Sequence, residues 1–246
     1  VISPPYIVDM TFDRLRYELR LLGKPVFFTP ILVVIGFALL LAIANRNVTL
    51  VARSMGASLE VLLPMAAGVV VATVATYDRA IELQLTMPRQ YHRTANMRFL
   101  FILLWIAVVS LLTSFLLYTF NYWRLPVQIA NWGQPWQFLA WQLTWLSSTL
   151  WLVALGLVFS LLIRSRTAGG MLICALSIAE LFFHDVFMSN TMLHPVFLFP
   201  LTFSPDASYW LVNRIELLGT AAMLLMLAWF LLRIPELLLS HAPGEE

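Results

Sequence analysis

Six long apolar segments, separated by shorter polar connections, constrain the fold of this chain more than any other feature. A helix rises 1.5 Å per residue, so about 20 apolar residues are needed to cross the hydrocarbon core of a bilayer. Six segments meet or approach this length: 26–44, 59–77, 99–120, 138–163, 167–183 and 211–232. Only 11% of the 246 residues are charged, about half the share usual in soluble domains. We therefore predict an all-α integral membrane protein with six transmembrane helices in a single domain, residues 1–246.

The distribution of lysine and arginine predicts the orientation of these helices. Cytoplasmic connections of membrane proteins carry an excess of both residues. Here eleven of the fifteen lie in the termini and in the connections on the same side, against four on the other side. This bias predicts a multi-pass protein of the cell membrane with cytoplasmic N- and C-termini. The net charge of +2 is small and dispersed, so nucleic acid is not an expected partner.

An amphipathic basic helix is predicted over residues 11–24, directly before the first apolar segment. Its apolar residues recur at the spacing of one helix face: Phe12, Leu15, Leu19 and Leu22. Arg14, Arg16 and Arg20 lie mostly off that face. Such a helix is typical of the membrane interface, where its basic side chains meet lipid headgroups. It serves either as a topology anchor or in a mechanical role, and the residues alone do not separate the two.

The connection over residues 78–98, DRAIELQLTMPRQYHRTANMR, is unusually long and charged for this chain. Pro88 is expected to end a short helix, because proline lacks an N–H donor and disfavours helix at the preceding residue. The arginines that follow would then be available to a partner or to lipid headgroups: Arg89, Arg93 and Arg98. We interpret the segment as a docking element, with an ordinary solvated loop as the alternative.

Residues 184–210 form a second unusual connection. Its prolines recur every five residues at Pro195, Pro200 and Pro205. They prevent one continuous helix, and the apolar stretch between them is too short to span a bilayer. Its aromatic residues are Phe197, Phe199 and Phe203, which would be costly to expose to water. We predict a re-entrant outer segment, buried in lipid or against the helices, with a packed plug without a gating role as the alternative.

Ionisable residues at membrane depth are candidates for function. Four stand near the ends of the apolar segments: Glu60, Glu180, Arg214 and Glu216. We expect Arg214 to pair with Glu180 or Glu216, as a structural ion pair or as side chains that reach the interface. The chain contains neither a nucleophile–base motif nor a metal-ligand spacing, so no catalytic or metal site is predicted. Lys24 is the sole lysine and is followed by proline, which excludes a phosphate-binding P-loop.

The order of these parts resembles the membrane subunit of a type-two ATP-binding-cassette exporter. The resemblance extends over nearly the whole chain and includes two short stretches: Glu82-Leu83-Gln84-Leu85-Thr86-Met87-Pro88 and Leu198-Phe199-Pro200-Leu201-Thr202-Phe203-Ser204-Pro205. It implies that 11–24 is the connecting helix, 78–98 the coupling segment and 184–210 the outer helices. A departure from the family pattern is Asp78-Arg79-Ala80-Ile81, where the family often has a small pair before the coupling glutamate. The coupling register is therefore open by a few residues.

The same resemblance implies a function. The chain would be the permease subunit of a transporter, an exporter of an amphipathic or hydrophobic substrate, and not itself an enzyme. It would hold no cofactor, because a separate cytosolic ATPase subunit would bind ATP and magnesium. That subunit would dock on Glu82, Leu85, Thr86, Pro88 and Arg89, and a second permease chain, identical or related, would complete the pathway within the membrane lipid. Two alternatives are a non-transporting scaffold or accessory subunit and a small intramembrane enzyme that acts on lipids.

Overall fold

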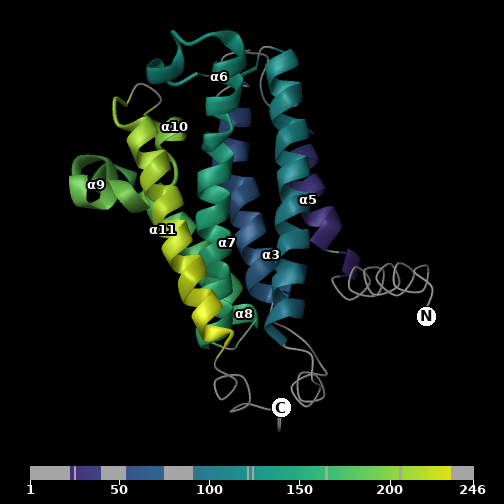
Figure 1. Cartoon of the computed structure of the whole chain (residues 1–246). Helices are drawn as coiled ribbons and strands as arrows, with labels where there is room; N and C mark the ends of the chain where they lie inside the picture. Colours follow the sequence, from purple (N-terminus) through teal and green to yellow (C-terminus); the bar gives the residue numbers. More distant parts are fainter. Residues whose placement is uncertain are drawn as a thin grey trace, which may run out of the picture.

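The regular structure of the chain is helical throughout the part that the computed structural model describes. That part comprises residues 23–24, 26–39, 54–74, 91–120, 122–123, 125–163, 166–204 and 207–233. Its named elements are η1 (Ser58–Leu62), α3 (Leu63–Val74), α5 (Tyr91–Thr119), η2 (Val127–Ile129), α6 (Gln134–Trp141), α7 (Leu143–Ile163), α8 (Arg166–Phe182), α9 (His184–Ser189), η3 (Thr191–Val196), α10 (Pro200–Phe203) and α11 (Trp210–Leu231). Figure 1 shows the long helices side by side in one bundle, with α9 projecting from its flank. The predicted all-α class is confirmed.

Four of the described helices are long and apolar enough to cross a membrane: Ser54–Thr73, Ala95–Thr119, Gln134–Ile163 and Trp210–Leu231. Two further apolar helices, Val26–Leu39 and Thr167–Phe182, are shorter. The chain is thus a membrane-embedded helical protein, and the full set of six spans remains a prediction. Parts of the predicted first and second spans, 40–44 and 75–77, lie outside the described residues.

The predicted boundaries of the spans agree with the observed helices to different degrees. The sixth predicted span, 211–232, differs from α11 by one residue at each end. The third span was predicted to begin at residue 99, whereas α5 begins at Tyr91. No proline or glycine interrupts the chain between these two positions, so the helix starts inside the predicted coupling segment.

Arg98 shows the consequence of this longer helix. We expected its side chain to face a partner or lipid headgroups, but it is only 3% exposed. It shares one face of α5 with the buried residues Ala95, Phe99 and Ile102, at the spacing of neighbours on a helix surface. The continuous helix therefore turns Arg98 toward the bundle, and the expectation was wrong for this residue.

Helix α7 is the centre of the bundle and packs against α3, α8 and α11. Four consecutive residues, Trp151 to Ala154, are buried, as expected for a helix that is apolar on all sides and surrounded by others. Its contact with α3 is unusually close. A Cβ atom added to Gly156 would lie 2.6 Å from the carbonyl oxygen of Gly68. Glycine at both positions therefore allows the two helix backbones to touch.

The first apolar helix, Val26–Leu39, is attached to α5. The indole Nε1 of Trp105 donates a hydrogen bond to the carbonyl oxygen of Phe27 at 3.0 Å. The two rings also meet edge to face, with centroids 5.7 Å apart. An indole N–H buried in apolar surroundings needs an acceptor, and this contact supplies one.

The predicted outer segment folds into three short helices, α9, η3 and α10, which lie along the flank of the bundle (Figure 1). Phe197, Leu198 and Phe199 are completely buried, and Phe203 is partly buried. These aromatic side chains were predicted to be buried in lipid or against the helices, and the structure shows the second. Entry of the segment into the membrane stays a prediction.

Two sets of predicted residues lie outside the described part of the chain. They are Arg14, Arg16 and Arg20 of the interface helix, and Glu82, Leu85, Thr86, Pro88 and Arg89 of the coupling segment. Their predicted roles stay predictions.

Candidate functional site

A buried carboxylate at the start of the second apolar helix is the first component of the candidate site. Glu60 is 0% exposed and lies within the π-helical turn η1. The π-helix is a rare, locally widened turn that often occurs at functional positions. Ser58 begins this turn, and its hydroxyl donates to the carbonyl oxygen of Met55 at 2.7 Å. The irregular turn thus places a charged side chain inside the bundle.

The Glu60 carboxylate binds the backbone of the outer segment. The N–H of Leu201 donates to Oε1 at 3.0 Å, and the N–H of Thr202 donates to Oε2 at 2.7 Å. The Thr202 hydroxyl donates to the same Oε2 at 2.6 Å. Both N–H groups belong to the first turn of α10, where a helix has no internal acceptors for them. Glu60 supplies these acceptors from a residue about 140 positions earlier in the chain.

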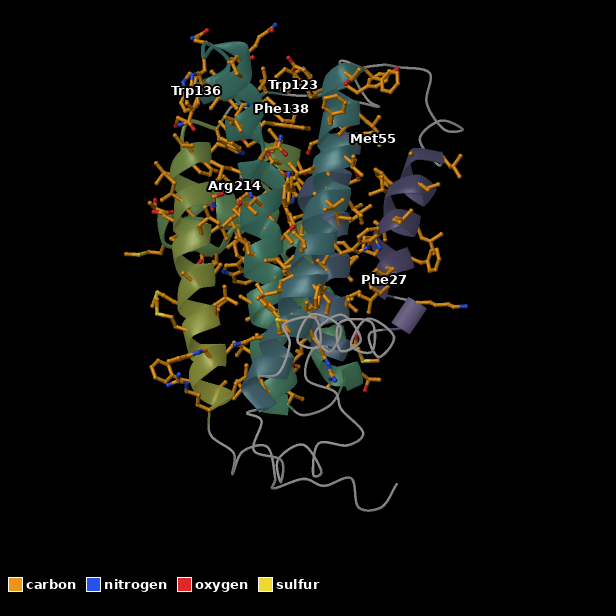
Figure 2. The ribbon with its side chains drawn as sticks, turned by 45° about the vertical axis from the view of Figure 1, so that its right-hand side comes forward. Phe27, Met55, Trp123, Trp136, Phe138 and Arg214 are labelled. Atoms are coloured by element: carbon orange, nitrogen blue, oxygen red, sulfur yellow. The ribbon has the colours of Figure 1, made fainter. Side chains whose placement is uncertain are left out.

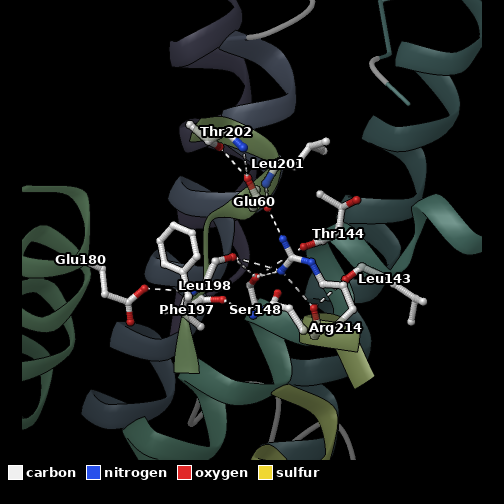
Figure 3. Close-up of polar contacts among 12 residues, drawn as sticks. Glu60, Leu143, Thr144, Ser148, Glu180, Phe197, Leu198, Leu201, Thr202 and Arg214 are labelled. Carbon is white, nitrogen blue, oxygen red and sulfur yellow. Dashed lines mark hydrogen bonds and ion pairs between the residues drawn. The ribbon is translucent and has the colours of Figure 1, made fainter. Parts of the chain in front are cut away.

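Arg214 neutralises Glu60 from the opposite helix. It projects from α11, is 0% exposed, and forms an ion pair with Glu60 through Nη2. Its Nη1 donates to the hydroxyls of Ser147 and Ser148, at 3.2 and 2.9 Å, and to the carbonyl oxygen of Leu198 at 3.0 Å. Figure 3 shows the guanidinium between Glu60 and the Leu198 peptide. The arginine therefore joins η1, α7, α11 and the outer segment.

Leu198 is bound from both sides of its peptide. Its N–H donates to Glu180 Oε2 at 3.0 Å, and its carbonyl also accepts from the Ser148 hydroxyl at 3.0 Å. One residue earlier, the carbonyl oxygen of Phe197 accepts from Asn213 Nδ2 at 2.9 Å. Figure 3 shows Glu180 approaching Leu198 from the side away from Arg214. Side chains of four helices, η1–α3, α7, α8 and α11, thus hold residues 197–202.

The side chains of this cluster hold the backbone of residues 197–202 in place. We use the name polar clamp for Glu60, Ser148, Glu180, Asn213 and Arg214. Its hydrogen bonds satisfy backbone groups that the irregular 197–202 segment cannot pair within itself. Burying two charges is unfavourable unless each is paired and hydrogen-bonded, and Glu60 and Arg214 meet both conditions. Arg214 Nε and Thr144 Oγ1 have no hydrogen-bond partner among the described residues.

Three residues of the polar clamp agree with candidates predicted from the amino-acid sequence. Glu60, Glu180 and Arg214 were candidates, but the ion pair of Arg214 is with Glu60, not with Glu180 or Glu216. Glu216 is partly exposed on α11, and it takes part in none of the ion pairs among the described residues. The expectation of a structural ion pair is confirmed, whereas the expected partner was wrong because burial brings together residues 154 positions apart.

Ser148 and Asn213 were missed as site residues. A signal for them exists, because polar side chains inside apolar segments are expensive and usually have a specific partner. Ser147, Ser148 and Thr149 are three consecutive polar residues in the middle of an apolar run.

No protein-family model, curated protein or solved structure matches this chain.

Proposed function

We propose that this chain is the permease subunit of an ATP-binding-cassette exporter, driven by a separate cytosolic ATPase. The observation that carries the proposal is the outer segment, folded into short helices between the last two apolar helices and bound to four of the helices around it. The resemblance implies short outer helices at this place in the chain. A solvated loop, the ordinary connection in a membrane bundle, would not need a buried ion pair to fix its backbone.

The polar clamp supports a role of the outer segment in closing a pathway. Hydrogen bonds hold residues 197–202 against η1 and against the N-terminal ends of α7 and α11. A substrate leaving by this end would require the segment to move. Hydrogen bonds from fixed side chains give such a segment one defined closed position. In the proposed transporter, that position is the resting state.

ATP would act from the opposite side of the membrane through the coupling segment, 78–98. The residues of this segment proposed to contact the ATPase are Glu82, Leu85, Thr86, Pro88 and Arg89. The interface helix, which carries Arg14, Arg16 and Arg20, would transmit the same movement. A second permease chain would complete the pathway. The substrate is proposed to be amphipathic or hydrophobic, because aromatic residues are 13% of the chain.

Co-purification from the native membrane tests this proposal. The tagged chain is extracted in mild detergent, and its partners are quantified by mass spectrometry together with ATP hydrolysis. Glu82→Ala and Arg89→Ala are compared with the control Arg233→Ala. In wild type, the guanidinium carbon of Arg233 lies 3.6 Å from the centroid of the Trp229 ring. We expect a P-loop ATPase at about one per permease with wild type and Arg233→Ala, and several-fold less with the coupling variants.

Three outcomes would contradict the proposal. Equal ATPase recovery and equal hydrolysis in all variants would remove the coupling role of 78–98. Recovery of the chain without any ATPase, across several detergents, would favour a scaffold or accessory subunit. Lipid turnover by the isolated chain without nucleotide would favour an intramembrane enzyme.

A further inference from the structure

A groove opens at one end of the bundle, between the last turns of α5 and the first turn of α6. Its volume is ≈ 200 Å³, and its walls are Phe115, Tyr118, Gln134, Pro135 and Phe138. It lies away from the polar clamp, and none of its residues belongs to the predicted coupling segment. The groove is therefore a separate feature that the proposed function does not use.

The lengths of the helices favour a position of this groove at the surface of the bilayer. The 21 residues of α7 extend about 32 Å, which by itself covers the hydrocarbon core of about 30 Å. Helix α6 precedes α7 and continues the same apolar span, Gln134–Ile163. If α7 spans the core, the first turn of α6 extends beyond it into the headgroup layer. The groove lies at that turn.

The residues around the groove have the composition of an interfacial layer. Residues 121–142 contain a single charged residue, Arg124. They contain four tryptophans: Trp123, Trp132, Trp136 and Trp141. Trp136 is 65% exposed, and Figure 2 shows it with Trp123 and Phe138 at the same end of the bundle. Tryptophan is enriched where a membrane protein meets lipid headgroups.

The walls of the groove are held in place by ring contacts. The Tyr118 ring meets Trp123 and Phe138 edge to face, with centroids 4.8 and 5.3 Å away. On the α6 side, Gln137 Nε2 donates to the carbonyl oxygen of Ala130 at 2.7 Å. Aromatic pairs of this geometry stabilise one another beyond simple burial. The groove is thus formed without a ligand, as small-molecule sites usually are.

One wall of the groove continues into the exposed apolar face of α5. Phe115 is 57% exposed, and Leu104, Leu111 and Leu112 lie exposed further down the same helix. An acyl chain lying along this face of α5 would reach the groove at the C-terminal end of the helix. The volume accommodates about seven groups of the size of water, which is enough for one ester group and a few neighbouring carbons but not for a whole lipid.

We propose that the groove binds one glycerophospholipid of the surrounding bilayer. The ester region lies against Gln134, whose exposed amide both donates and accepts hydrogen bonds. The first acyl carbons pack on Phe115 and Phe138, and the rest of the chain follows α5. Because none of the five lining residues is charged, binding does not depend on an anionic headgroup.

Native mass spectrometry of the purified chain tests this site. The delipidated protein is titrated in detergent with phosphatidylcholine, phosphatidylethanolamine or phosphatidylglycerol. Gln134→Trp fills the groove from an exposed position, and Asn131→Trp makes the same kind of change at an exposed position outside it. We expect one tightly bound lipid in wild type and Asn131→Trp, and at least about tenfold weaker binding in Gln134→Trp, since the ring occupies the volume the ester needs.

A second variant covers the case in which the added ring disturbs folding. Gln134→Leu removes only the amide, and we expect binding to weaken about fivefold, the effect of one hydrogen bond. Unchanged binding in both variants, or no lipid retained by wild type, would overturn the proposal. Binding of phosphatidylglycerol more than about tenfold tighter than phosphatidylcholine would also overturn it, because that preference requires a cationic site. Each of these results is independent of whether an ATPase docks on the chain.

Discussion

Two contacts in this protein differ in how they hold one segment against another. The first joins α3 to α7, and the second attaches residues 197–202 to the bundle. Both hold one segment against another in apolar surroundings. The helices meet through Gly68 and Gly156, with no side chain between their backbones. The outer segment is held by the polar clamp, which includes a completely buried ion pair.

The difference follows from the backbone of each segment. A regular helix pairs its own N–H and C=O groups, so in a membrane it needs only a close fit to its neighbour. Residues 197–199 are not helical, and α10 has only four residues. Their backbone groups need partners from elsewhere in the protein. We infer that the polar clamp is present because this stretch is irregular.

Removal of Glu60 is expected to have the largest effect. Glu60→Leu leaves the Arg214 charge without its ion-pair partner and the N–H groups of Leu201 and Thr202 without acceptors. Breaking a buried pair on one side costs about 3–5 kcal/mol of unfolding free energy. Unfolding in mild detergent, followed by tryptophan fluorescence, measures this change. Glu216→Leu, at a partly exposed position of α11, serves as the control and should change little.

A double variant shows whether the pair or the single charge matters. In Glu60→Leu with Arg214→Met, neither member of the ion pair is left buried without the other, so part of the lost stability should return. If the two losses simply add, Glu60 and Arg214 do not act as a pair. The polar clamp would then be two independent contacts.

The glycine contact gives the second largest effect. Gly156→Ala places a Cβ atom 2.6 Å from the Gly68 carbonyl oxygen, which forces the backbones of α3 and α7 apart. Overpacking of this kind costs about 1–3 kcal/mol. Gly219→Ala is the matched control, because its Cβ would meet nothing within 4 Å. It should leave stability unchanged or raise it by up to about 1 kcal/mol through helix propensity. Equal losses at both glycines would show that the close approach is not the cause.

The two attachments also differ in how far sequence predicts them. Apolar length predicted α11 to within one residue at each end, because a helix is determined by its own residues. The π-helical turn at Glu60 and the start of α5 at Tyr91 were not predicted, since neither changes the apolar pattern. The burial of Phe197 and Phe199 followed from the cost of exposing them. The Glu60–Arg214 pair did not follow, because spacing along a chain says nothing of which distant charges meet.

Ser148 provides a smaller test of the polar clamp. Ser148→Ala removes the donor to the Leu198 carbonyl and one acceptor of Arg214, but both groups keep other partners. We expect a loss of about 1 kcal/mol, the net value of a typical hydrogen bond. Ser160→Ala, at a buried serine whose hydroxyl bonds only within its own helix α7, should cost less. A loss of about 3 kcal/mol or more for Ser148→Ala would place the serine on a level with the ion pair.

A substitution of Glu180 that keeps an acceptor oxygen is expected to change the unfolding free energy least. Glu180→Gln retains an acceptor for the Leu198 N–H, so the unfolding free energy should change by less than about 1 kcal/mol. Glu180→Leu leaves that buried N–H unpaired and should cost about 1–3 kcal/mol. A large loss in both variants would mean that the negative charge of Glu180, and not its acceptor oxygen, holds the segment. The clamp would then be organised by a group of three charges around Arg214, and the irregular backbone would be its consequence instead of its cause.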